Sequence, residues 1–126
     1  MANLIEAHGY QGDAMNLPVG DVDTAVSFYV EKMGFRIVEQ IQTPTKKAVL
    51  ARDKVQFAIA ENGGDPEQDG CAFHTDDIDG LREEFKANGY APGEIKTENR
   101  KDGTVFRAFF AIAPDGLCYW FGERQG

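Results

Sequence analysis

Residues 17–35 read LPVGDVDTAVSFYVEKMGF. Asp21 is followed by apolar residues that recur every three or four positions, which is the period of one helix face. An aspartate just before such a run caps the free N–H groups of a helix start, and Gly34 is typical of a helix end. The stretch therefore predicts a strand over residues 14–19 and a helix between Asp21 and Gly34.

The same pattern occurs a second time, 56 residues further along the chain. Residues 71–89 read CAFHTDDIDGLREEFKANG, with Asp77 or Asp76 as the helix cap and Gly89 as the stop. Three strand-like runs follow each helix, at Arg36–Ile41, Lys47–Ala51 and Val55–Glu61 and then at Glu94–Thr97, Thr104–Ile112 and Leu117–Gly122. Tight turns at Asp102-Gly103 and Asp115-Gly116 separate the last three runs.

This repetition predicts an α+β domain over residues 1–126, built from two tandem βαβββ units. The first unit covers about residues 12–61 and the second about residues 70–123, and the polar residues 62–69 read as a linker. Two such units are expected to pack their sheets around a central cavity.

The net charge, the apolar runs and the number of cysteines limit the classes of function that fit this sequence. The net charge of −8 disfavours nucleic acid as a partner, because phosphate contacts need a basic face. The sequence has no apolar run approaching 18 residues and no charged-then-apolar leader, so we expect a cytoplasmic protein without a membrane span. Two cysteines are too few for a disulfide framework or a zinc cluster, and Cys71 and Cys118 are expected on opposite faces of neighbouring strands.

The last strand-like run raises a question about its two faces. Residues 113–123 read APDGLCYWFGE, and side chains alternate between the faces of a strand. Tyr119 and Phe121 share one face, which suits the core. Cys118 and Trp120, the only tryptophan of the chain, share the other face with Gly122.

The chain resembles the vicinal oxygen chelate superfamily, which includes glyoxalase I, bleomycin-resistance proteins and extradiol dioxygenases. The resemblance rests on residues 17–35, on residues 71–89 and on RAFFAIAPDGLCYWF at 107–121, and it covers nearly the whole chain. It implies the paired-unit fold described above. It also implies that members commonly form homodimers in which each cavity draws on two chains.

Enzymes of this superfamily hold a divalent metal through His, Gln and Glu side chains at four positions. By resemblance these positions fall on Ala14, Gly70, Trp120 and Ala58, or on Phe57 if the register shifts by one residue. None of these side chains is able to coordinate a cation. We therefore expect no metal or other cofactor at these positions, and Trp120 stands where a metal-holding member has a carboxylate.

Alternation and the resemblance together assign side chains to the cavity. The expected lining comprises Trp120, Phe110, Phe106, Cys118, His74, Asn16 and Gln56, with space left by Gly70, Ala72, Ala14 and Ala108. Large apolar walls with a few polar groups are typical of a small-molecule site. Trp120 is either a stacking platform for a ligand or a plug that fills the core.

The main hypothesis is a metal-free protein that binds an aromatic or antibiotic-like small molecule, similar to the bleomycin-resistance branch, and that forms a homodimer. A second hypothesis is a lyase, isomerase or dioxygenase with an atypical site, in which His74 acts as acid or base. A third is a structural or regulatory domain with a filled cavity.

Overall fold

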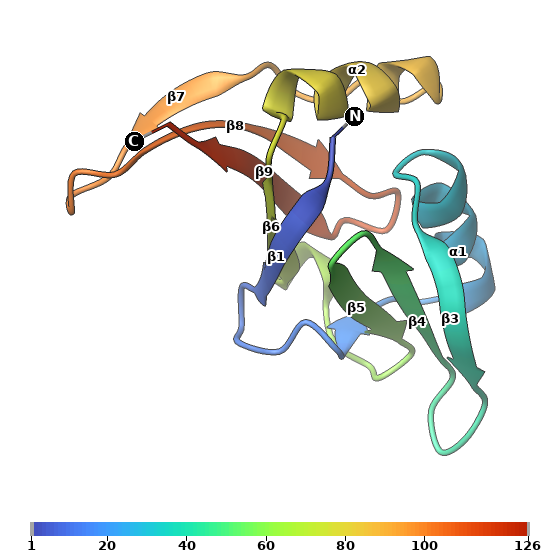
Figure 1. Ribbon diagram of the computed structural model, residues 1–126. Coiled ribbons are helices and arrows are strands. Elements are labelled where there is room, and N and C mark those ends of the chain that lie inside the picture. Colours follow the sequence, from blue (N-terminus) through green and yellow to red (C-terminus); the bar gives the residue numbers. More distant parts are fainter. Residues whose placement is uncertain (1, 126) are drawn as a thin grey trace.

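The computed structural model describes residues 2–125 and contains two β-sheets and two α-helices (Figure 1). The elements in chain order are β1 (Leu4–Gly9), β2 (Leu17–Pro18), α1 (Val22–Glu31), β3 (Arg36–Ile41), β4 (Lys47–Arg52), β5 (Val55–Ala60), a 3₁₀ turn η1 (Pro66–Gln68), β6 (Gly70–Thr75), α2 (Ile78–Ala87), β7 (Lys96–Asn99), β8 (Val105–Ile112) and β9 (Cys118–Arg124). Sheet A has the strand order β1-β6-β9-β8-β7, and sheet B has the order β2-β5-β4-β3. The α+β class expected from the sequence is confirmed. Among residues 2–125, no helix is long and apolar enough to cross a membrane.

Both helices begin where the sequence pattern places them. The Asp21 side chain accepts a hydrogen bond from the Thr24 N–H, at 3.3 Å, and the Asp77 side chain accepts one from the Gly80 N–H, at 2.9 Å. Asp77 is thus the second cap. The other candidate, Asp76, binds Asn3 instead and ties the N-terminal segment to sheet A.

The N-terminal part of the chain differs from the prediction. The strand expected over residues 14–19 shortens to Leu17–Pro18, which pairs in parallel with β5. An additional strand, β1, pairs with β6 and becomes the edge of sheet A. A β-bulge between Leu4 and Glu6 interrupts the period-two alternation of β1, so the sequence shows no alternating pattern that predicts this strand.

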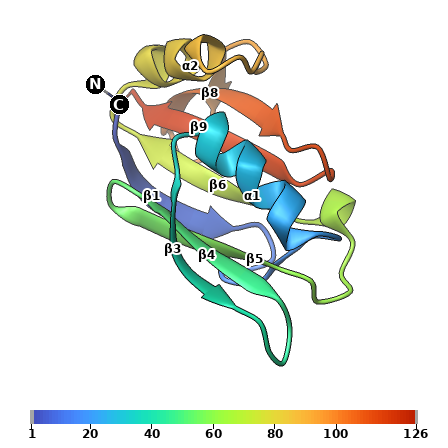
Figure 2. The ribbon, with the colours of Figure 1, turned by 90° about the vertical axis from the view of Figure 1, so that its right-hand side faces the viewer.

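One aromatic core joins the two sheets on the side that carries the helices. Tyr29 of α1 packs edge-on against Phe57 of sheet B and against Tyr119 of sheet A, with ring centroids 5.3 and 5.6 Å apart. Phe85 of α2 packs against Phe121 at 5.2 Å. Figure 2 shows α1 lying across the region where the two sheets meet. The helix side of both sheets is therefore a single buried cluster.

A buried arginine also ties the two halves together. Arg52, at the end of β4, binds both carboxylate oxygens of Glu84 in α2 at 2.7 Å. Its guanidinium also donates to the carbonyl oxygen of Met33 at 2.7 Å and to that of Ala2 at 3.3 Å. A fork of planar donors fits a carboxylate with two parallel bonds, which fixes the orientation of the partners as well as their distance. The contact holds α2 against sheet B.

The hydroxyl groups of Tyr29 and Tyr119 provide a test of this shared core. They lie 2.5 Å apart in a fully buried position, and burial raises the pKa of both groups, so both stay neutral. Replacing either residue by phenylalanine leaves one buried hydroxyl without its partner, and we expect a loss of about 1–3 kcal/mol in the free energy of unfolding. The double variant should lose less than the sum of the two single losses, because no orphaned hydroxyl remains.

Urea denaturation of the wild type, the two single variants and the double variant measures this coupling. Two additive losses would show that the hydroxyl pair does not link α1 to sheet A.

Candidate ligand-binding site

The face of sheet A opposite the helices is open and apolar. The pairing of β9 with its neighbours sets Ala72, Trp120 and Phe110 side by side on this face. Phe110 is 49% exposed and Ile112 is 58% exposed, so large apolar side chains on β8 face solvent. Exposed apolar groups that gather on one face commonly mark a place where a ligand or a partner binds.

A hollow of about 340 Å³ lies on this open face. Its lining comprises Tyr10, Ala72, His74, Glu98, Arg100, Phe110 and Trp120. Every one of these residues belongs to sheet A or to a segment that directly follows one of its strands. The hollow, which we call the aromatic pocket, is therefore built on one sheet, whereas the sequence pattern predicts a cavity enclosed by both sheets.

The Trp120 ring is held in place from several sides. Its Nε1–H donates to a Glu98 carboxylate oxygen at 3.0 Å, and the Arg100 guanidinium lies over the ring, 5.4 Å from its centroid. The ring also lies over Gly122, where an added Cβ would overlap it. Because Trp120 is only 6% exposed, most of its surface is already covered. The aromatic surface that remains open in the pocket belongs to Phe110 and Tyr10.

His74 lines the pocket on β6, the strand next to β1, and Phe106 packs against it outside the lining. The His74 ring lies edge-on to Trp120 and to Phe106, with centroid separations of 5.2 and 5.5 Å. Burial lowers the pKa of His74, which favours its neutral imidazole. A neutral imidazole is able to accept a proton or to coordinate a metal ion.

The remaining sequence-derived candidates lie outside the lining of the aromatic pocket. Asn16 binds Asp13 and Lys47 through its side chain, and Gln56 is an exposed residue of β5 in sheet B. Cys118 is on the open face, and its sulfur accepts a hydrogen bond from the Tyr10 hydroxyl at 3.9 Å. Four residues assigned to the cavity from the sequence line the pocket, namely Trp120, Phe110, His74 and the small residue Ala72, and Phe106 packs against Trp120 and His74.

The space expected above Gly70 is filled, so that part of the prediction is wrong. An added Cβ at Gly70 would come within 2.6 Å of the Tyr10 ring and would overlap the Cys118 carbonyl oxygen. The Tyr10 ring packs over the glycine and narrows the open face. Gly70 is thus a contact point for an aromatic ring.

The four positions that the family resemblance assigns to a metal carry no side chain suited to hold one. The main-chain N–H of Ala58 donates to the carbonyl of Ala14 at 2.9 Å, so these two positions are neighbours. Phe57 packs in the aromatic core with Tyr29, which leaves Ala58 as the residue on the other face of β5. Alanine, glycine and tryptophan side chains offer no ligand atom for a divalent ion.

Sequence reasoning missed three lining residues: Tyr10, Glu98 and Arg100. Tyr10 follows β1, the strand whose bulge hides the alternating pattern in the sequence. Glu98 lies opposite Phe106 in the hairpin of β7 and β8. Counting the pairs back from the Asp102-Gly103 turn would have placed Glu98 on the face of Phe106, so a signal for it is present in the sequence.

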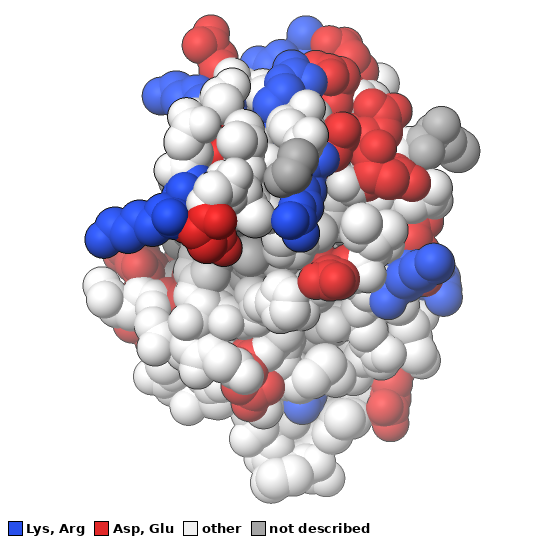
Figure 3. Space-filling model, turned by 60° about the vertical axis from the view of Figure 1, so that its left-hand side comes forward, with Lys and Arg blue, Asp and Glu red and all other residues white. Residues whose placement is uncertain are grey.

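Charge on the surface is mixed. On the face drawn in Figure 3, basic and acidic side chains are interspersed toward the top, and uncharged surface covers most of the lower half. Within the aromatic pocket, Arg100 pairs with Glu98 at 3.1 Å. Among the described residues, the face drawn in Figure 3 offers no continuous basic area of the kind that a nucleic-acid backbone requires.

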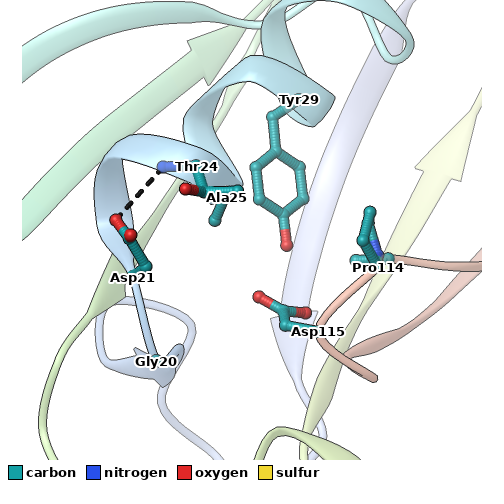
Figure 4. A pocket seen from close by; sticks show the side chains of 8 residues that line it. Gly20, Asp21, Thr24, Ala25, Tyr29, Pro114 and Asp115 are labelled. Carbon is teal, nitrogen blue, oxygen red and sulfur yellow. Dashed lines mark hydrogen bonds between the residues drawn. The ribbon is translucent and has the colours of Figure 1, made fainter.

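A second hollow, of about 200 Å³, lies between the start of α1 and the turn that joins β8 to β9 (Figure 4). The Tyr29 hydroxyl points toward the Asp115 carboxylate across this hollow, and the Asp21–Thr24 cap closes one side. Burial raises the pKa of Asp115. A half-buried carboxyl in this place is less stable ionised than in water.

The raised pKa of Asp115 gives a test with a defined sign. The protonated form contributes stability below the ordinary aspartate pKa of about 3.9, and that contribution is lost as the pH rises through the higher pKa of the folded protein. An asparagine side chain at this position cannot ionise, and its oxygen is still able to accept a hydrogen bond from the Leu117 N–H. Asp115→Asn should therefore gain stability relative to the wild type as the pH rises from about 3 to about 7. Thermal melts across this pH range measure the difference.

Asp102→Asn is the matched control, because Asp102 also precedes a turn glycine. Hydrogen bonds from Thr104 lower the pKa of Asp102, so this variant should show the opposite trend with pH. Equal pH trends for the two variants would contradict the assigned burial of Asp115.

Known proteins share this architecture. The family model of the Glyoxalase/Bleomycin resistance protein/Dioxygenase superfamily matches residues 12–121. An antibiotic-binding protein from a Streptomyces species is 19% identical with a TM-score of 0.71, covering 88% of this chain and 93% of that one. The bleomycin resistance determinant encoded on transposon Tn5 is 24% identical with a TM-score of 0.64, covering 89% of this chain and 96% of that one.

A superfamily member from Alicyclobacillus acidocaldarius is 19% identical with a TM-score of 0.71, and the alignment covers 89% of each chain. Among curated protein sequences, none matches this chain significantly. The solved structures share the fold at low identity, and the family model covers most of the sequence. The chain therefore belongs to the glyoxalase/bleomycin resistance protein/dioxygenase superfamily.

Proposed function

We propose that this protein binds an aromatic or antibiotic-like small molecule in the aromatic pocket, without a metal at the positions that related enzymes use. The observation that carries the proposal is the pocket itself. A half-exposed Phe110 lies beside a nearly buried Trp120 and an Arg100–Glu98 ion pair, so a flat apolar ligand finds an aromatic surface and two polar partners. Such a mixture is typical of small-molecule sites.

The similarity to an antibiotic-binding protein and to a bleomycin resistance determinant supports the same proposal. These two proteins share the fold at low identity, so they suggest a ligand class and leave the ligand itself to experiment. The net charge of −8 suits a cationic or neutral ligand, because the overall field of the protein attracts positive charge.

A second candidate function is catalysis with His74 as acid or base. The observation in its favour is that burial lowers the pKa of His74 beside the pocket, which keeps a neutral base available near pH 7. Incubating the protein with a candidate compound, and then measuring the mass of that compound by mass spectrometry, separates the two functions. A binding protein returns the compound unchanged, whereas an enzyme converts it.

Phe110 provides the sharpest test of ligand binding. We expect bleomycin or quinoline to change the fluorescence of Trp120, the only tryptophan, and we expect Phe110→Ala to weaken binding by about tenfold or more. An aromatic contact contributes about 0.5–1.5 kcal/mol beyond the apolar area that it buries. Fluorescence titration gives both affinities.

Val38→Ala is the matched control, because Val38 is 51% exposed and lies on β3 of sheet B. Its ligand affinity should equal that of the wild type. Binding that persists in Phe110→Ala, or that is lost equally in the control, would place the ligand elsewhere.

We also propose that a second copy of the chain completes the pocket. Ile112 and Phe110 leave a large apolar area uncovered on the same face, and a two-fold dimer is the commonest closed assembly.

Sedimentation velocity at about 10 μM should show a dimer, and Ile112→Lys should shift it toward the monomer, since a buried charge opposes association. Val38→Lys should remain dimeric. A wild-type monomer that binds ligand normally would refute the shared pocket.

A further inference from the structure

Three side chains with metal-binding atoms converge at the outer edge of the open face. Glu6 and His8 lie two residues apart on β1, and Glu6 lies directly opposite His74 on the neighbouring strand β6. The carboxylate oxygen and the two imidazole nitrogens all lie within 4.8 Å of one another. They share the face of sheet A that carries Trp120.

The β-bulge in β1 creates this convergence. It lies between Leu4 and Glu6, so Leu4 points into the core while Glu6 turns to the open face opposite His74. Beyond the bulge, regular alternation brings His8 to the same face, opposite Ala72. Bulges commonly redirect a side chain in this way near functional sites.

The donor set indicates which ions would bind. Two imidazoles and one carboxylate suit Zn²⁺ and its neighbours Ni²⁺ and Cu²⁺, whereas Ca²⁺ and Mg²⁺ prefer sites made of oxygen atoms alone. Three protein ligands with a fourth position open to water are typical of accessible zinc sites. We propose that Glu6, His8 and His74 form a site for one divalent transition-metal ion at the edge of the aromatic pocket.

The geometry is close to what an ion needs. Two ligands about 2.0–2.1 Å from a tetrahedral ion are about 3.4 Å apart, and the Glu6 carboxylate already lies 3.1 Å from His8 Nε2. The side chains of His8 and Glu6 are 63% and 64% exposed, so both are free to rotate onto an ion. His74 is held edge-on between Trp120 and Phe106, which gives the site one fixed ligand.

The electrostatic surroundings favour ions that bind through strong ligand bonds. Arg124 lines the hollow that Glu6 and His74 share, and Arg100 lies near the same end of the pocket, paired with Glu98. These positive charges disfavour a cation held by charge alone. Imidazole ligands bind Zn²⁺, Ni²⁺ and Cu²⁺ directly, so this site should select those ions over Mg²⁺.

This site differs from the positions that hold the metal in related enzymes, and it does not depend on the proposed ligand. It has a spectroscopic signature, because the His74 ring centroid lies 5.2 Å from that of the only tryptophan in the chain. Bound Ni²⁺ or Cu²⁺ should quench Trp120 fluorescence, whereas Mg²⁺ should not.

The test uses the full chain without a polyhistidine tag, after chelator treatment and removal of the chelator. Calorimetric titration with Zn²⁺ should give one ion per chain, and titration with Ni²⁺ should quench Trp120. His8→Gln and Glu6→Gln change exposed side chains, and each should weaken Zn²⁺ binding by at least about tenfold, since even loss of a group that only supports a ligand costs about 10–100-fold. His74→Gln should do the same.

Glu94→Gln is the matched control, because Glu94 is an exposed carboxylate outside the cluster, and it should bind Zn²⁺ as the wild type does. Circular dichroism checks that each variant is folded. Binding that does not saturate by about 1 mM Zn²⁺ would overturn the proposal, and so would unchanged affinity in both His8→Gln and Glu6→Gln. Phe110→Ala should retain Zn²⁺ binding, so failure of the aromatic ligand proposal stays distinguishable from failure of the metal site.

Discussion

The parallel pairing of β6 with β9 is the interaction on which the rest of the structure depends. It sets Phe73 beside Phe121 on the helix side and Ala72 beside Trp120 on the open side. Because side chains alternate regularly along β6 and β9, one register decides both the composition of the core and the composition of the pocket. A slip by one residue would bury the tryptophan face under the helices and expose the phenylalanine face.

Contacts on the helix side of sheet A support its open face. The Tyr29–Tyr119 hydroxyl pair and the fork between Arg52 and Glu84 join sheet B and both helices into one support behind sheet A. A face that is supported from behind keeps its shape while remaining exposed to solvent. Large apolar side chains such as Phe110 therefore stay on the surface, because burying them would require a partner or a ligand.

The open face combines two kinds of chemistry at neighbouring places. At its centre, Trp120 is held by Glu98 and Arg100, and this arrangement suits an aromatic ligand. At its edge, His74 belongs both to the pocket lining and to the cluster with Glu6 and His8. The positions that the family resemblance assigns to a metal carry Ala14, Ala58, Gly70 and Trp120, whose side chains offer no ligand atom for a divalent ion.

The sequence by itself determined the helices, most of the strands and the two faces of β9. These depend on local signals: the caps at Asp21 and Asp77, the turn at Asp115-Gly116, and a hydrophobic period that is read within one segment. Only the tertiary structure decided that Tyr10 fills the space above Gly70, that Glu98 holds the Trp120 ring, and that the bulge in β1 brings Glu6 to His74. These contacts join segments far apart in the chain, and the free energy that fixes them comes from packing and pairing between strands, which no single segment encodes.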